Sequence, residues 1–182
     1  MKTLVIHPED STTEFLAAIY EKLGNKTVIR GGITKSEVQE LIESHERVIM
    51  LGHGAPYGLL NPGRFPGAGL FIVDGSMACS LKIGANNIFI WCYAEKFVQS
   101  YGLSGLCSGM FISELGEAEY WRLKGIDQGM IDQSNKQFAS IVSKYINESL
   151  DSLYTRLPQE YEILAKTNSI ARFNLDRLYF PV

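Results

Sequence analysis

Several classes of protein are excluded by what this 182-residue sequence lacks. It has three cysteines, Cys79, Cys92 and Cys107, and no CxxC pair, so we expect neither a disulfide framework nor a zinc site. It has no cluster of lysine and arginine and a formal charge of −3. A nucleic acid or an anionic membrane is therefore not an expected partner. No apolar run approaches the roughly 20 residues that span a bilayer.

The N-terminal segment indicates where the protein is located, and the glycine pattern indicates which ligands are not expected. "MKTLVIHPED" has one lysine and a short apolar run before it turns acidic, and such a run is too short for a signal peptide. We therefore expect a cytoplasmic protein. Gly31-Gly32 follows a predicted strand, but no GK[ST] follows it and the chain has no GxGxxG. Nucleotide binding is not expected, and no metal or organic cofactor is implied.

Apolar runs alternate with capped, amphipathic helical segments along the first half of the chain. Strands are predicted over 3–7, 27–30, 47–51, 87–91 and 109–115, with a short strand at 70–73, and helices over 76–83 and 131–146. Thr34-Lys35-Ser36-Glu37 is a capping box that starts another helix. Residues 55–69 are rich in proline and glycine and indicate a loop or hairpin tip.

This alternation predicts an α/β fold with a mainly parallel central sheet and helices on both faces. The expected architecture is a three-layer α/β/α sandwich that forms a single domain over residues 1–182. In the C-terminal tail we expect a helix near 161–165 and a strand near 170–175.

Chemistry-bearing residues follow three of the predicted strands. In open parallel sheets, sites form beyond the carboxyl ends of the strands, where His7, His53 and Cys92 fall. His45 precedes its strand and belongs to the opposite edge. His7 is a rival partner for the cysteine, but it precedes Pro8 and not a flexible glycine.

His53 and Cys92 together have the chemistry of a nucleophilic pair. The thiolate is the reactive form of a cysteine, and a free thiol has a pKa of about 8.5, so a neighbouring histidine is needed to take its proton. Gly54 has no Cβ and can bring its N–H close to a ligand. The N–H groups of Gly54 and Cys92 are the candidates for an oxyanion hole.

The segments "VIMLGHG" and "IFIWCYA" resemble the caspase-like cysteine peptidases. That group includes caspases, metacaspases, gingipains, clostripain, separase and the bacterial CHAT domains. It shares a core strand that ends in His-Gly, a hairpin insertion, and a core strand that ends in Cys. The likeness covers roughly residues 1–146, and it implies that His53 is the general acid/base and Cys92 the nucleophile of a thiol protease. The implied partner is a peptide or protein substrate.

The surroundings of the cysteine differ from those of caspases. Trp91-Cys92-Tyr93 replaces Gln-Ala-Cys-x-Gly, so strict aspartate specificity is not expected. The resemblance places Trp91 at the floor of the specificity pocket. Glu117 and Glu119 would share one side if the fifth strand continued through them, and two carboxylates there would bind an arginine or lysine side chain.

Two other classes of function fit the same sequence. Cysteine is among the most buried residue types, and a histidine before a glycine can simply cap a turn, so the chain could be a catalytically inactive interaction module on the same scaffold. It could also be an unrelated flavodoxin-like domain whose loops bind a small ligand. The acidic run could be a solvated surface. The sequence does not indicate an oligomeric state.

Overall fold

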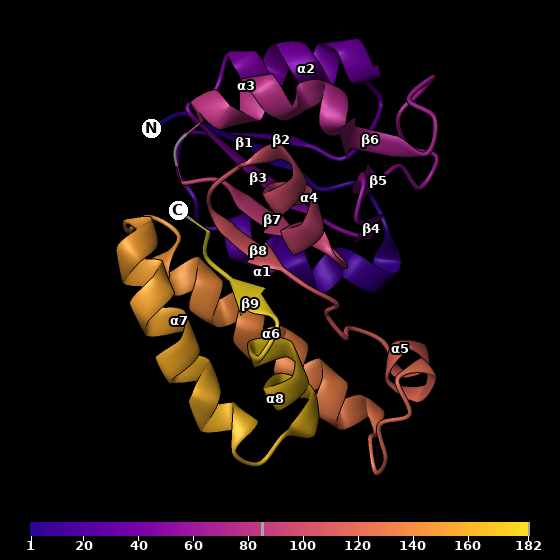
Figure 1. Cartoon of the computed structure of the whole chain (residues 1–182), viewed down its shortest axis with the longest axis vertical. Helices are drawn as coiled ribbons and strands as arrows, with labels where there is room; N and C mark the ends of the chain where they lie inside the picture. The colour runs from indigo at the N-terminus through magenta and orange to yellow at the C-terminus, as the bar shows by residue number, and fades with distance from the viewer. Residues whose placement is uncertain (85, 182) are drawn as a thin grey trace.

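The computed structural model describes residues 1–84 and 86–181, and a six-stranded sheet lies at its centre (Figure 1). The strands are β1 (Thr3–Ile6), β2 (Lys26–Ile29), β3 (Arg47–Leu51), β7 (Ile88–Ile90), β8 (Leu106–Ser108) and β9 (Leu178–Tyr179), in the order β2-β1-β3-β7-β8-β9. The first five in this order run parallel, and β9 is antiparallel to β8. The predicted parallel pairing of 3–7, 27–30, 47–51 and 87–91 is therefore confirmed.

The central strands are apolar because both of their faces are covered. Every residue of β1, β3, β7 and β8 is buried, whereas the edge strand β2 is half-buried at three of its four positions. Alternate residues of each strand point to opposite faces. Val5 and Ile49 belong to one hydrophobic cluster, and Leu4 and Val48 belong to the other.

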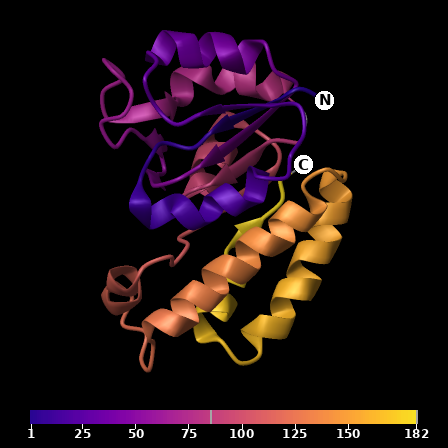
Figure 2. The same ribbon diagram turned by 180° about the vertical axis from the view of Figure 1, so that it is seen from behind.

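Helices cover both faces of the sheet, an arrangement compatible with the predicted sandwich. One face packs against α2 (Lys35–Glu43), η2 (Gly75–Met77) with α3 (Ala78–Ile83), and α4 (Ala94–Tyr101). The other packs against η1 (Ser11–Leu16) with α1 (Ala17–Tyr20), α6 (Gln128–Tyr145) and α7 (Leu150–Ala165). Figure 2 shows α1 and α6 side by side on this second face.

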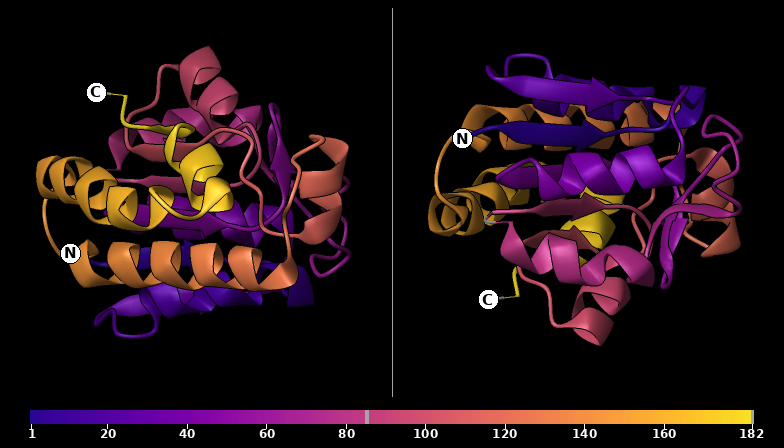
Figure 3. Two further views of the ribbon diagram at one scale, coloured as in Figure 1. Left: turned by 90° about the horizontal axis from the view of Figure 1, so that it is seen from below. Right: turned by 90° about the horizontal axis from the view of Figure 1, so that it is seen from above.

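The remaining helices are α5 (Leu115–Tyr120) and α8 (Ser169–Leu175). The C-terminal helices α6, α7 and α8 lie on the side of the molecule away from α2 and α3 (Figure 3). Among the residues described, no helix is long and apolar enough to cross a membrane. The predicted capping box starts α2, where the Thr34 side chain and Glu37 cap each other's backbone N–H.

A small second sheet fills the insertion between β3 and β7. It consists of β4 (Gly54–Ala55), β5 (Gly58–Leu60) and β6 (Phe71–Asp74), paired antiparallel in that order. The predicted short strand at 70–73 corresponds to β6. The hairpin places the backbone that follows His53 directly above the carboxyl edge of the central sheet.

Two predicted strands are wrong. The fifth core strand is β8 at Leu106–Ser108, and the predicted segment 109–115 is a loop that leads into α5. The Asn174 side chain pairs the buried backbone groups of this loop: it accepts from the Ile112 N–H at 2.7 Å and donates to the Ile112 carbonyl at 2.9 Å. The predicted strand at 170–175 is α8, whose first turn is capped by the Asn168 side chain. Buried apolar residues imitated a strand pattern in both cases, in a loop at 109–114 and in a helix at 170–175.

Candidate functional site

His53 and Cys92 occupy equivalent positions on neighbouring strands. Leu51 of β3 and Ile90 of β7 are register partners, and His53 and Cys92 each lie two residues beyond them. The Gly52 N–H donates to the Ile90 carbonyl at 3.0 Å and extends the pairing by one residue. The parallel register therefore brings the two predicted catalytic residues to one point of the sheet edge.

Both side chains line one small cavity of about 20 Å³. Its other walls come from η1, from the ends of β3 and β7, and from the loop after β8; they are Thr13, Phe15, Leu16, Gly52, Ile90, Trp91, Phe111 and Ser113. A volume of this size holds about one water molecule. The cavity is thus closed to a peptide in this conformation, although both predicted groups border it.

A short chain of hydrogen bonds orients His53. Its Nε2 lies 2.6 Å from the Thr12 hydroxyl oxygen. The same hydroxyl lies 2.6 Å from Oδ1 of Asp10, which also accepts the Thr12 backbone N–H at 2.9 Å. Asp10 is the N-cap of η1, so the segment directly after β1 supplies the partner of His53. Asp10 and Thr12 were not among the residues predicted to form the site.

Cys92 lies in a tight turn between β7 and α4. Tyr93 has a φ of 66°, in the left-handed region that a non-glycine residue seldom adopts. The Ala94 N–H donates to the Trp91 carbonyl at 3.2 Å, and the buried Ser108 hydroxyl donates to the same carbonyl at 2.8 Å. Hydrogen bonds to the ends of two strands therefore fix the backbone around the thiol. The left-handed conformation of Tyr93 is strained, and such strain is common at active sites.

The Cys92 thiol is protonated in this state. Its pKa is raised to about 12, mainly by burial and also by the nearby Glu117 carboxylate. Its Sγ lies 3.7 Å from the Phe111 carbonyl and 3.9 Å from Oε1 of Glu117, with the thiol as donor. Within the described residues no hydrogen bond joins Cys92 to His53. His53 bonds η1 through Thr12, whereas Cys92 bonds the loop after β8 and helix α5.

The acidic residues Glu117 and Glu119 do not share a face in the way that strand alternation predicts, because they belong to helix α5. Oε2 of Glu117 accepts the backbone N–H groups of Ser113 and Glu114 at 2.7 and 3.2 Å. Glu117 therefore anchors the start of α5 and contacts the thiol. Glu119 is exposed on the same helix. A pair of carboxylates formed by these two residues is not present.

Trp91 is a core residue with 1% of its surface exposed. Its ring packs between Phe89 and Phe97, and its Nε1 donates to the Ala55 carbonyl at 3.1 Å. A Cβ on Gly54 would lie 2.0 Å from Cδ1 of Trp91, so the glycine after His53 is required for this packing. Gly54 also pairs with Leu59 in the hairpin. Its predicted oxyanion role, shared with the Cys92 N–H, stays a prediction.

Two wider hollows adjoin the small cavity. One of about 260 Å³ lies on the His53 side, with apolar walls from Pro8, Leu60, Pro62 and Leu70. The other, of about 520 Å³, lies beyond Ser113, between η1, the start of α5 and α6. A still larger open groove between α1 and α6 borders neither His53 nor Cys92.

The 520 Å³ hollow is rich in hydrogen-bond acceptors. Glu114 and Asp132 contribute carboxylates to its lining, and no lysine or arginine lines it. Asn135 is 6% exposed and donates through Nδ2 to the Ser113 carbonyl at 2.9 Å, while its buried Oδ1 has no hydrogen-bond partner. The two carboxylates of the lining favour a ligand that carries positive charge and donates hydrogen bonds.

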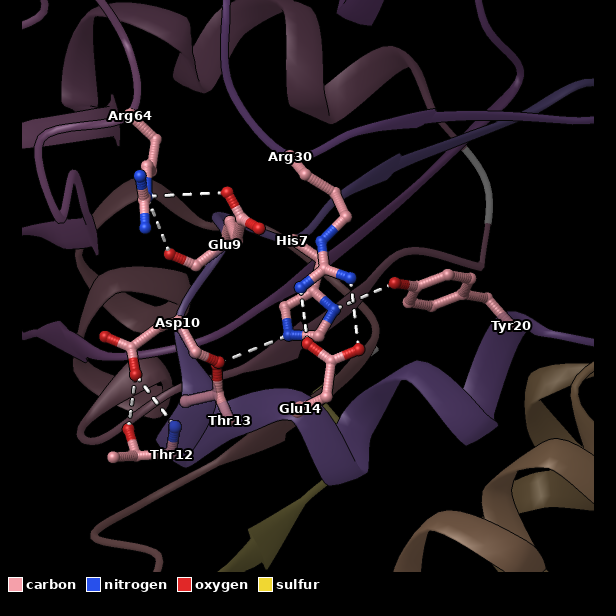
Figure 4. A network of polar contacts seen from close by, with 9 residues as sticks. All are labelled: His7, Glu9, Asp10, Thr12, Thr13, Glu14, Tyr20, Arg30 and Arg64. Carbon is pink, nitrogen blue, oxygen red and sulfur yellow. Dashed lines mark hydrogen bonds and ion pairs between the residues drawn. The ribbon is translucent and has the colours of Figure 1, made fainter.

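His7 is not available to the thiol. It is fully buried, and its ring nitrogens bond the Tyr20 hydroxyl at 3.0 Å and the Thr13 hydroxyl at 3.3 Å (Figure 4). Its pKa is lowered to about 4, mainly by burial and also by the nearby Arg30 cation. His7 therefore holds η1 against the sheet as a neutral imidazole. His45 lies at the opposite edge of the sheet and bonds Thr27 at 2.9 Å.

No cluster of three or more metal-binding side chains exists in the described part of the chain. A comparison of this chain with protein-family models, with curated proteins and with solved structures finds no match.

Proposed function

We propose that this protein is a caspase-like cysteine endopeptidase that hydrolyses peptide bonds with a Cys92–His53 dyad. The observation that carries the proposal is the register at the sheet edge: partners Leu51 and Ile90 are followed at equal distance by a histidine and a cysteine that border one cavity. The order of the two strands along the chain, and the hairpin between them, match the layout of the caspase-like peptidases that the sequence resembles.

In the proposed reaction, His53 takes the proton of Cys92 and the thiolate attacks the carbonyl carbon of the scissile bond. The tetrahedral intermediate collapses when His53 returns the proton to the leaving amine. A water molecule, deprotonated by the same imidazole, then hydrolyses the acyl-enzyme. The backbone N–H groups of Gly54 and Cys92 are the proposed donors to the oxyanion.

The resting conformation requires one change before this chemistry. The thiol now bonds Phe111 and Glu117, and the cavity between it and His53 holds about one water. We propose that substrate binding moves the loop after β8 and the start of α5, which releases the sulfur toward His53. Both contacts of the thiol come from this one segment, so a single displacement removes both.

The proposed substrate carries a lysine or arginine next to the scissile bond. The acceptors for its cation are the carboxylates of Glu114 and Asp132 in the hollow beside Ser113. Charged hydrogen bonds of this kind are stronger than neutral ones. Glu117 contacts the thiol, Glu119 is exposed on α5 and Trp91 is buried in the core, so the preference is assigned to the two carboxylates of the hollow.

Digestion of a proteome-derived peptide mixture tests the proposal. Cleavage after basic residues is expected from the wild-type protein and is lost in Cys92→Ala and His53→Ala. Asp132→Asn should weaken cleavage after lysine and arginine about tenfold, and Cys79→Ala is the matched control for loss of a thiol. Cleavage that survives in Cys92→Ala would refute the dyad, whereas cleavage after other residues would refute only the specificity.

A catalytically inactive interaction module is the second candidate. The buried, protonated thiol and the closed cavity favour it. Absence of cleavage, combined with an unreactive Cys92 in the presence of every peptide, is the result expected of such a module.

The cytoplasm is the proposed location of the protein. The three cysteines are free, which suits a reducing compartment.

A further inference from the structure

The Thr12 hydroxyl has a single proton to share between two partners. Its oxygen lies 2.6 Å from Oδ1 of Asp10 and 2.6 Å from Nε2 of His53. An ionised carboxylate can only accept, so the hydroxyl must donate its proton to Asp10. The hydroxyl oxygen is then an acceptor toward His53, and Nε2 must carry a proton to complete the second bond.

Asp10 remains ionised because of the same contacts. The hydrogen bond from the Thr12 side chain is the main cause that lowers the pKa of Asp10, followed by the Thr12 backbone N–H. The Arg64 cation also favours the charged form. The reverse arrangement, in which Thr12 donates to His53, would need a protonated Asp10 and is excluded near neutral pH.

We infer that Thr12 and Asp10 are positioning residues that hold His53 as the Nε2–H tautomer, leaving Nδ1 as the atom that takes the proton of Cys92. This inference rests on the proposed function, since it assigns the atom that acts as base. Within the described residues no hydrogen bond involves Nδ1 of His53, so its lone pair is free to accept. The chain of contacts runs Asp10, Thr12, His53 and then the cavity shared with Cys92.

The proton transfer balances without another reactant. The Sγ–H bond of Cys92 breaks, an Nδ1–H bond forms, and the thiolate and imidazolium are produced together. Nε2–H stays bonded to Thr12, and the Asp10 carboxylate one hydroxyl away compensates the new positive charge. The same Nδ1–H later gives its proton to the nitrogen of the leaving amine, which restores the neutral imidazole.

The local structure explains how two short side chains can fix a ring 41 residues away. Asp10 caps η1 through the Thr12 N–H, so the carboxylate and the hydroxyl are held by one turn (Figure 4). His7 anchors that turn to the sheet through Thr13. His53 itself follows Gly52, which has a φ of 142° that favours glycine.

Nitrogen NMR of histidine-labelled protein tests the tautomer directly, at a pH where His53 is neutral. The wild-type protein and Thr12→Ser should both show protonated Nε2, because serine keeps the hydroxyl. Thr12→Val keeps the shape, removes the hydroxyl, and should yield a mixture of tautomers. Thr155→Val on the exposed face of α7 is the matched control and should leave the His53 signals unchanged. Resonances are assigned by the loss of one signal in His53→Ala.

Cleavage kinetics supply the second readout. Thr12→Val should lower kcat about tenfold, and Thr12→Ser, which keeps the hydroxyl, should restore most of it. Protonated Nδ1 in the wild-type protein, or an unchanged tautomer in a folded Thr12→Val protein, would overturn the inference. The Nε2–H tautomer in a protein that cleaves no peptide would instead overturn the proposed function and leave the positioning by Thr12 standing.

Discussion

The rate at which iodoacetamide labels Cys92 can be estimated from the pKa of its thiol. Its pKa is raised from 9.0 to about 12. At pH 8 its thiolate fraction is therefore about a thousandfold below that of a free thiol. A more basic thiolate is also a better nucleophile, by roughly 20-fold over three pKa units, so the net deficit is about 50-fold before steric burial is counted.

The perturbation that relieves this deficit is Glu117→Gln. Glutamine removes the negative charge 3.9 Å from Sγ, and its amide oxygen can still accept from the Ser113 and Glu114 N–H groups. Burial is the larger cause of the raised pKa and persists in the variant, so we expect recovery of about one pKa unit. The thiolate fraction then rises about tenfold and its nucleophilicity falls about threefold, so the labelling rate should rise roughly three- to fourfold. Glu119→Gln removes an exposed carboxylate two residues later and is the matched control.

Mass spectrometry of the labelled peptides measures all three cysteines in one sample. The exposed Cys79 should label first, and Cys92 and the buried Cys107 should follow much later. The dyad expected from the sequence would make Cys92 the fastest, so the resting structure predicts the opposite order. Labelling of wild-type Cys92 as fast as Cys79 at pH 7, or no gain in Glu117→Gln, would refute this account of the thiol.

Three further predictions concern stability. His7 has a folded pKa of about 4 against 6.5 when unfolded, so its contribution is lost as the pH falls from 6.5 to 4; urea unfolding should show a loss of about 2 kcal/mol by pH 5 that is absent in His7→Gln. Gly54→Ala places a Cβ 2.0 Å from the Trp91 ring and should cost about 1–3 kcal/mol in the free energy of unfolding. Asn174→Ala leaves the buried N–H and carbonyl of Ile112 unpaired and should cost about 2–4 kcal/mol, measured in the same way.

Matched variants separate these effects from general damage. Gly116→Ala adds a Cβ that meets nothing within 4 Å, and Asn147→Ala removes an exposed amide, so both should unfold within about 0.5 kcal/mol of the wild type. Equal stability of Gly54→Ala and Gly116→Ala would contradict the packing of Trp91. Equal stability of the two asparagine variants would contradict the role of Asn174, and an identical pH profile in His7→Gln would contradict the burial of a neutral His7.

The sequence was sufficient for the core of the sheet because the signal there is local. The runs at 3–7, 47–51 and 87–91 are apolar since both faces are covered, and their parallel order follows from the helices between them. The same pattern failed at 109–115 and 170–175. There the side chains of Asn174 and Asn168 satisfy the backbone, which no periodicity records.

The candidate site divides in the same way. The positions of His53 and Cys92 could be predicted because each lies two residues beyond the end of a core strand, and residues 51 and 90 of those strands are register partners. Their partners could not, since Asp10, Thr12 and Glu117 depend on how two loops fold over the sheet edge. An Asp-x-Thr directly after a core strand is the signal that would have pointed to the histidine partner.

Covalent capture of Cys92 tests the central claim most directly. The wild-type protein is incubated with a lysine-bearing peptidyl acyloxymethyl ketone, which alkylates a cysteine nucleophile only after the peptide has bound, and the adduct is located by peptide mapping. The account predicts a single adduct on Cys92 that is lost in His53→Ala, reduced in Thr12→Val and restored in Thr12→Ser. An adduct on Cys79 alone, or an adduct on Cys92 that forms equally fast without His53, would contradict it.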